Sequence, residues 1–131
     1  MVNKNNIMNE QFVTYEIALK LKEIGFNEPC FARFNKGNFQ MNKLGDWYKH
    51  NSGEIDKSYL SASLWQQVID WFRINHNYDI WIEHYNKDDT YIFQCPQWNS
   101  TKILGYFKTY EEAREKAILK AIEIVKRHLE Q

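Results

Sequence analysis

Few cysteines, no long apolar run and no net charge characterise this sequence, and each removes a class of protein. Its 131 residues include 2 cysteines, and 17 Lys or Arg residues balance 17 Asp or Glu residues. No apolar run approaches the roughly 20 residues that a membrane span needs. A balanced chain also lacks the overall basic field of a dedicated nucleic-acid or anionic-membrane protein. Any charged patch must therefore be local.

The cysteines and the first residues bear on the compartment. Cys30 and Cys95 form no CxxC pair, and residues 1–12 are rich in Asn and Lys without an apolar segment. We therefore expect no secretory signal and reduced thiols. The sequence predicts a cytoplasmic protein without a membrane partner.

Signatures of catalysis and metal binding are also missing. The chain has no G-x-S-x-G, G-x-x-x-x-G-K-[ST], G-x-G-x-x-G or H-E-x-x-H motif. A Cys/His metal site needs three or four ligands. His84 is the one histidine on a predicted strand with a thiol, Cys95, in reach, and we interpret this pair as a buried thiol and a surface imidazole. We predict no catalytic residue, no metal and no cofactor, and hence no enzyme.

Aromatic and apolar residues are abundant instead. They make up 16% and 44% of the chain, which excludes disorder over most of its length. The length suits one domain, and the sequence shows no repeat or linker. We predict a single domain over residues 1–131, with residues 1–8 disordered.

Three helices are predicted, and the first ends in a defined way. It begins at Asn9 or Thr14, and Ile17, Leu21 and Ile24 form its apolar stripe. Gly25 follows at the position where a helix end commonly adopts the left-handed conformation, and Phe26 can pack against the last turn, as in a Schellman ending.

The other two helices have N-terminal signatures. The second begins at Ser61 or Ser63 and runs to about Asn75, with Ser63 and Gln66 in a capping-box spacing. The third opens with Thr109 and Glu112 in the same spacing. Its buried face is predicted to comprise Ala113, Ala117, Ile118, Ala121, Ile122, Val125 and Leu129.

The remaining apolar segments are predicted strands. A hairpin joins 30–34 to 39–41 and precedes a long loop over 42–57; residues 78–85, 90–95 and 102–109 form a three-strand antiparallel meander. The fold class is therefore α+β, a two-layer fold of an antiparallel sheet packed by three helices, in the order α-β-β-α-β-β-β-α.

The two faces of the meander raise the question of what covers them. Along 78–85, Ile80 and Ile82 share one face while Trp81, Glu83 and Tyr85 share the other. Helices can cover one face while aromatic side chains shield the other. The alternative is that Trp81 and Tyr85 belong to a surface for a partner or for a second copy in a homodimer.

Aromatic residues on loops are the other candidate contacts. Trp47 and Tyr48 lie in the long loop, and Trp98 lies in the loop over 96–100. A Trp on a loop has no periodic reason to be buried, so these side chains are candidates for binding a protein. The alternative is that each ring anchors its loop to the core.

A basic and aromatic segment runs from Arg33 to His50. Its four cations face one acidic residue, Asp46, and alternate with aromatic residues; the cations are Arg33, Lys36, Lys43 and Lys49. Cations that meet phosphates and rings that stack on bases are the parts of a single-strand nucleic-acid binder. An ordinary Lys- and Asn-rich loop with anchoring aromatics has the same composition.

Several segments together resemble a known family. They are 14–18, Gly25-Phe26, 28–30, the distinctive stretch 61–73 and 110–113. The chain is similar here to small phage- and prophage-encoded proteins of unassigned activity from Bacteroides-like bacteria. Ser63 stands where that family is expected to have proline, and either residue suits a helix start. The resemblance implies a bacterial host cell and supplies no active residues.

These observations predict a non-catalytic protein-binding module that acts on a host or phage protein. Single-stranded nucleic-acid binding through residues 33–50 is the first alternative. A small-molecule-binding counter-defence protein is the second, and it requires a deep pocket.

Overall fold

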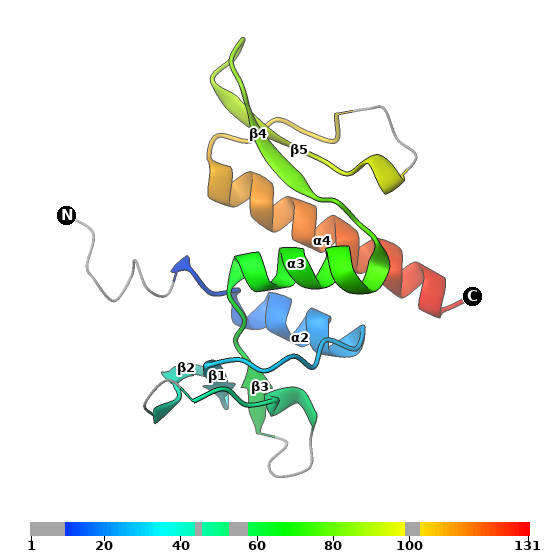
Figure 1. The fold of residues 1–131 in the computed structure, drawn as a ribbon. Coiled ribbons are helices and arrows are strands. Elements are labelled where there is room, and N and C mark those ends of the chain that lie inside the picture. The colour runs from blue at the N-terminus through cyan, green and yellow to red at the C-terminus, as the bar shows by residue number, and fades with distance from the viewer. Residues whose placement is uncertain (1–9, 44–45, 53–57, 99–102) are drawn as a thin grey trace, which may run out of the picture. The chain divides into compact units, whose positions relative to one another are not determined.

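The computed structural model describes residues 10–43, 46–52, 58–98 and 103–131 (Figure 1). The chain divides into two compact units, residues 1–67 and 68–131. The division falls inside helix α3, Trp65–His76, where the sequence has no linker. Residues 1–8, predicted to be disordered, lie outside the described residues.

The first unit opens with helix α2, Tyr15–Glu23, which starts at the later of the two predicted positions and ends with the predicted chemistry. Thr14 is the N-cap, and its Oγ1 accepts the Ile17 N–H at 3.3 Å. At the other end Gly25 adopts φ 97° and donates to Lys22 O, while the Phe26 N–H donates to Leu21 O. These two bonds are a Schellman ending.

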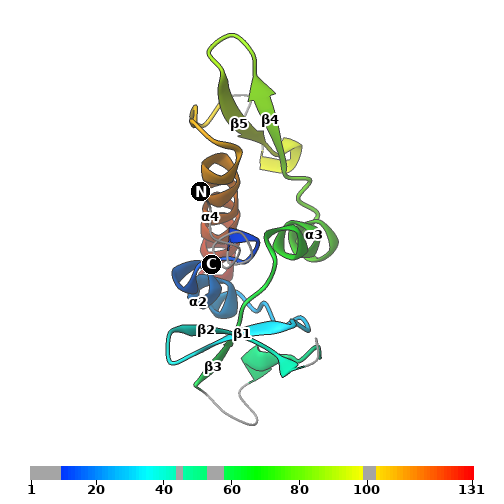
Figure 2. The same ribbon diagram turned by 90° about the vertical axis from the view of Figure 1, so that its left-hand side faces the viewer.

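The sheet of the first unit has three antiparallel strands in the order β2-β1-β3 (Figure 2). Strands β1, Ala32–Asn35, and β2, Asn38–Met41, form the predicted hairpin. Its two-residue turn has positive φ at both Lys36 and Gly37, as a type I′ turn requires. Helix α2 lies over this sheet and contacts β3.

Strand β3, Tyr59–Ser61, was not predicted. It pairs with β1 in the register Phe34↔Leu60. A strand of three residues is too short to show an alternating pattern, so its sequence reads as loop. The chain before it includes the 3-10 turn η2, His50–Ser52, in the region predicted to be loop.

The start of α3 corrects the predicted capping box. The helix begins at Trp65, and the backbone N–H of Trp65 donates to Gln11 O at 3.1 Å. The preceding residues are extended: Val13 N–H donates to Ser63 O, and Leu64 forms a bridge with Phe12. This pairing moves Ser63 away from the cap, and its buried Oγ has no hydrogen-bond partner among the described residues.

The second unit holds a two-stranded sheet. Strands β4, Trp81–Tyr85, and β5, Thr90–Gln94, pair antiparallel with Glu83 opposite Ile92. The 3-10 turn η3, Pro96–Trp98, follows β5.

The third meander strand, predicted over 102–109, is reduced within the described residues to one bridge, where Phe107 and Tyr91 exchange two backbone hydrogen bonds of 2.9 and 2.7 Å. Gly105, at φ 153°, interrupts the extended run just before it.

Helix α4, Tyr110–Leu129, packs against β4 and β5. Thr109 caps it by accepting the Glu112 N–H at 3.1 Å, as predicted. Six of the seven predicted face residues are buried: Ala113, Ala117, Ile118, Ala121, Ile122 and Val125. Leu129 is 64% exposed because the last turn extends beyond the packed face.

The α+β class is therefore confirmed, with three helices and antiparallel sheets among the described residues. The strands form two sheets instead of one, and they are divided three before α3 and two after it. The difference is local: β3 is added and the strand at 102–109 shrinks to a bridge. No helix in the described part of the chain has the length and hydropathy to cross a bilayer.

Candidate functional site

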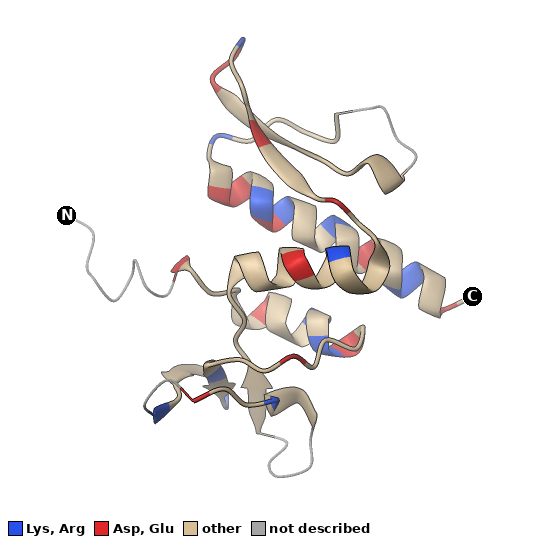
Figure 3. Ribbon diagram, viewed as in Figure 1, with Lys and Arg blue, Asp and Glu red and all other residues tan. Residues whose placement is uncertain are grey.

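A basic hollow in the first unit is lined by polar and aromatic groups, and we call it the basic pocket. Its volume is about 680 Å³. It is lined by Arg33, Gln40, Met41, Asn42, Lys43, Asp46, Tyr48, Lys49, His50, Ser52 and Tyr59. In Figure 3 blue segments outnumber red ones over the strands and loops that form it.

Three of the four predicted nucleic-acid residues converge on this pocket. Arg33 comes from the middle of β1, and Lys43 and Lys49 come from the segments that follow β2. Asp46 is the only carboxylate among the described lining residues. Lys36 lies in the β1–β2 turn and does not line the pocket, because the hairpin carries it to the end of the sheet.

Arg33 is held in place by two neighbours. Its Nε donates to Gln40 Oε1 at 3.1 Å from the opposite position on β2. Its guanidinium carbon lies 3.9 Å from the centre of the Tyr59 ring, which comes from β3. A cation over a ring face is attractive by about 0.5–2 kcal/mol. The sheet thus orients the positive charge of Arg33 at the pocket.

Asn42 and His50 form a buried pair whose hydrogen-bond direction can be assigned. Asn42 Nδ2 donates to Cys30 O at 2.9 Å and to Asp46 O at 2.7 Å. Its Oδ1 is therefore the acceptor, and it lies 3.2 Å from His50 Nε2. His50 Nε2 must carry the hydrogen of this bond. Burial, and then the charge of Arg33, lowers the pKa of His50 and favours the neutral ring.

Aromatic rings form one wall of the pocket. The His50 ring stands between Tyr48, with ring centres 5.8 Å apart, and Tyr59, at 6.0 Å. The Tyr48 backbone exchanges two 2.9 Å hydrogen bonds with Cys30, and its hydroxyl donates to Asp46 Oδ2 at 3.2 Å. Because its main chain is paired, Tyr48 presents its 52% exposed side chain from a fixed position.

The five predicted partner contacts divide between the units. Trp47 and Tyr48 lie in the first unit, and Trp47 is 56% exposed with its ring against Phe31 at 4.8 Å. In the second unit Trp81 is 44% exposed at the start of β4.

The other two are half-buried. Tyr85 lies against Tyr106, with ring centres 5.4 Å apart. Trp98 lies against Tyr78 and Phe93 at 5.8 and 6.2 Å, as a ring that anchors its loop would.

A second hollow lies in the second unit and has a volume of about 500 Å³. Cations of α4 line it beside Trp98, but Glu123 lies 3.7 Å from Lys120 Nζ and 3.6 Å from an Arg127 amino group. Its positive charge is therefore partly compensated within the helix.

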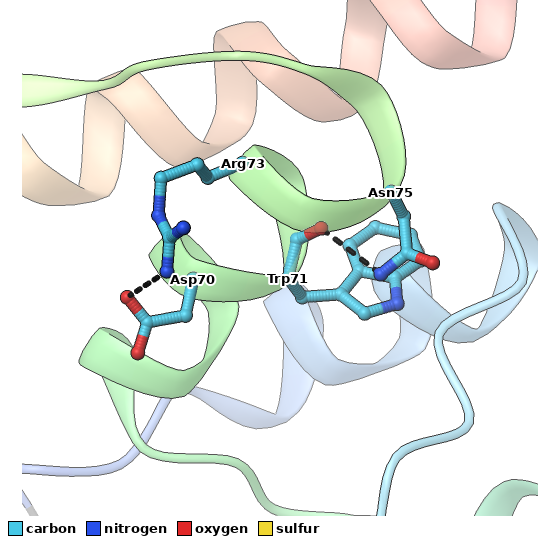
Figure 4. A network of polar contacts seen from close by, with 4 residues as sticks. All are labelled: Asp70, Trp71, Arg73 and Asn75. Carbon is cyan, nitrogen blue, oxygen red and sulfur yellow. Dashed lines mark hydrogen bonds and ion pairs between the residues drawn. The ribbon is translucent and has the colours of Figure 1, made fainter.

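The polar contacts on α3 are ordinary helix-surface contacts (Figure 4). Arg73 and Asp70 lie 3.8 Å apart one turn from each other, and both are well exposed. Asn75 Nδ2 donates to Trp71 O at 3.1 Å. Exposed pairs of this kind add little stability and present no cavity.

Nucleophilic and metal-binding groups are not assembled in the described part of the chain. No three His, Cys, Asp or Glu side chains there are close enough to hold a metal ion. Burial raises the pKa of Cys30 to about 12 and also raises the pKa of Cys95, which disfavours the thiolate form of both. His84 pairs with the exposed Asp89, at 2.8 Å, and not with Cys95.

Several pocket residues were not singled out from the sequence. They are Gln40, Asn42, His50 and Tyr59, and the pairing of β3 with β1 is what brings Tyr59 to Arg33. The cations themselves were visible as a local excess of charge. Comparison of the chain with protein-family models, with curated proteins and with solved structures finds no match.

Proposed function

We propose that the protein binds single-stranded nucleic acid through the basic pocket. The observation that supports this is the convergence of Arg33, Lys43 and Lys49 with the exposed ring of Tyr48 on one hollow. Lysine and arginine side chains neutralise phosphates, and an exposed aromatic ring stacks on a base without regard to its identity. Binding is non-catalytic in this proposal.

The cellular setting belongs to the same proposal. In this proposal the protein acts in the cytoplasm of a bacterial host cell, a setting that the resemblance to phage and prophage proteins and the free thiols of Cys30 and Cys95 support. Single strands are exposed there during replication and repair of phage or host DNA.

The test is a titration of a fluorescently labelled single-stranded oligonucleotide, followed by anisotropy at low salt. The double variant Lys43→Glu/Lys49→Glu is expected to weaken binding at least about tenfold, since it reverses two charges that face the ligand. Lys36→Glu is the matched control, because it reverses one charge of the same segment outside the pocket. Its affinity is expected to stay within about twofold of the unmodified protein.

Two outcomes would contradict the proposal. One is the absence of binding at low salt. The other is an equal loss in Lys36→Glu, which would show that net charge and not the pocket governs binding. Thermal melting of each variant separates a loss of binding from a loss of folding.

Binding to a host or phage protein is the second candidate, and the exposed rings of Trp47 and Trp81 favour it. Large exposed aromatic side chains are frequent hot spots of protein interfaces. A tagged protein is expected to recover a specific partner from infected-cell lysate, and Trp47→Ala or Trp81→Ala is expected to lose it. Light scattering of the purified protein distinguishes the homodimer from a hetero-partner.

A further inference from the structure

The size of the basic pocket limits what it can hold. Its volume of about 680 Å³ falls in the range of about 300–1,000 Å³ typical of small-molecule sites. Modules that track a long strand use a groove that covers about 4–16 nucleotides. The pocket is therefore matched to one unit of a strand and not to its length.

Three cations among the lining residues suit a phosphate group. Lys43 and Lys49 are exposed, and neither has an ion-pair partner among the described residues. Arg33 adds a third positive charge from the sheet, already oriented by Gln40 and Tyr59. Flexible ammonium groups beside a fixed guanidinium are the groups that bind phosphate oxygens.

Two further lining residues, Tyr48 and His50, suit a planar ring. The Tyr59 face is occupied by Arg33, whereas the Tyr48 side chain is half exposed. Next to it, neutral His50 uses Nε2–H for Asn42, so that its Nδ1 is left as an acceptor. No partner for Nδ1 is found among the described residues. A nucleobase offers both a face to stack on Tyr48 and N–H groups for such an acceptor.

We infer that the basic pocket is a site for a single nucleoside phosphate, with the phosphate on Lys43 and Lys49 and the base against Tyr48. The inference deepens the proposed function and rests on it in one respect, since both use the same pocket. The nucleoside phosphate can come from a free mononucleotide or from one residue of a strand, and the two sources share this chemistry.

The experiment is calorimetric titration of the full chain with three kinds of probe. The first kind is the four nucleoside 5′-monophosphates, the second is the corresponding nucleosides, and the third is inorganic phosphate. A monophosphate is expected to bind at least about tenfold more tightly than either the nucleoside or inorganic phosphate, because only it carries both a phosphate for the lysines and a base for Tyr48.

Two variants test which residues bind the base and which bind the phosphate. Tyr48→Ala is expected to lower the affinity for the monophosphate about tenfold and to leave that for inorganic phosphate unchanged, while Tyr48→Phe keeps the ring and the affinity. Lys43→Glu/Lys49→Glu is expected to abolish the binding of both anions. Lys36→Glu serves again as the control outside the pocket.

The source is tested by competition between the monophosphate and the labelled oligonucleotide. Displacement of the strand supports both proposals. Strand binding that millimolar monophosphate does not disturb overturns the inference and leaves the proposed function standing. Binding of the monophosphate without binding of any strand supports the inference and overturns the proposed function.

The remaining outcomes are equally decisive. Equal affinity for the monophosphate and inorganic phosphate, unchanged in Tyr48→Ala, overturns the inference because the pocket is then an anion site alone. Absence of binding by all of these small probes overturns the inference, and absence of binding by the labelled oligonucleotide as well overturns both proposals.

Discussion

His50 is a buried histidine with a defined hydrogen-bond partner, and its titration is coupled to folding. Burial and the charge of Arg33 lower its pKa, and burial and the charge of His128 lower that of His76. Below about pH 6.5 the unfolded chain then binds more protons than the folded protein. The stability present above that pH is therefore lost as the pH falls through this range.

We expect the free energy of unfolding to decrease between pH 7.5 and pH 5.5, measured by urea denaturation. The variant His50→Gln cannot titrate but keeps an amide donor for Asn42, so its decrease is expected to be smaller. His76→Gln is the parallel variant in the second unit. An unchanged pH dependence in both variants would contradict the assignment.

The two thiols give a second prediction at this level. Cys30 is buried, its pKa is raised to about 12, and its Sγ–H donates to Gln67 Oε1 at 3.6 Å. Cys95 is buried as well, with a raised pKa. Iodoacetamide at pH 8 is expected to modify neither thiol in the folded protein and both in urea, as measured by mass spectrometry. Rapid labelling of the native chain would be the contrary result.

Individual elements are stabilised at their ends, and α4 offers a clean test. Thr109 Oγ1 satisfies the Glu112 N–H, which has no partner inside the helix. Thr109→Ala is expected to lower the free energy of unfolding by about 1 kcal/mol, while Thr109→Ser keeps the acceptor and most of the stability. Equal losses in the two variants would show that the hydroxyl does not cap the helix. Thermal or urea denaturation measures both.

Two glycines with positive φ are expected to differ in their tolerance of a side chain. A Cβ on Gly25, at φ 97°, would meet nothing within 4 Å, so that Gly25→Ala is strained only by its backbone, at about 1 kcal/mol. A Cβ on Gly105, at φ 153°, would lie 2.8 Å from the Phe107 ring. Phe107 itself stacks on Phe93.

Because the ring of Phe107 is packed, Gly105→Ala is expected to cost more stability than Gly25→Ala. Urea denaturation of the two variants under one condition gives the comparison. The reverse order would mean that the segment after residue 102 shifts easily to make room.

For the whole molecule, the balance of 17 basic and 17 acidic residues governs how binding depends on salt. A chain without net charge attracts a strand only through local contacts. If the pocket neutralises one phosphate of the strand, the slope of log K against log salt is expected to be about −0.7, and if each of the three pocket cations neutralises a different phosphate, it is expected to be about −2. Titrations from 50 to 300 mM salt measure it, and a slope near zero would contradict phosphate binding.

The fold was predictable where neighbouring residues decide the structure. Thr109 as a cap, Gly25 with Phe26 as a helix end, and the turn between β1 and β2 all depend on a few consecutive residues. The capping box predicted at Ser63 was wrong because Ser63 pairs with Val13, which lies in a distant segment of the chain. The strand at 59–61 was missed for the same reason, since only β1 makes it a strand.

The candidate site was predictable only in its charges. The excess of lysine and arginine between residues 33 and 50 is a property of the sequence, and so is the presence of Tyr48 within it. The sequence could not show that Lys43 and Lys49 line the pocket whereas Lys36, in the hairpin turn, does not. That separation depends on where the strands end in space.

The α+β class, the three helices and the local basic character follow from the amino-acid sequence, because short-range periodicity, capping and charge need no distant partner. The three-dimensional fold is what places Arg33 over Tyr59, fixes the hydrogen-bonding state of His50 through Asn42, and encloses a hollow with these groups. Those contacts join strands and loops through backbone pairing, and no consecutive pattern in the chain encodes them.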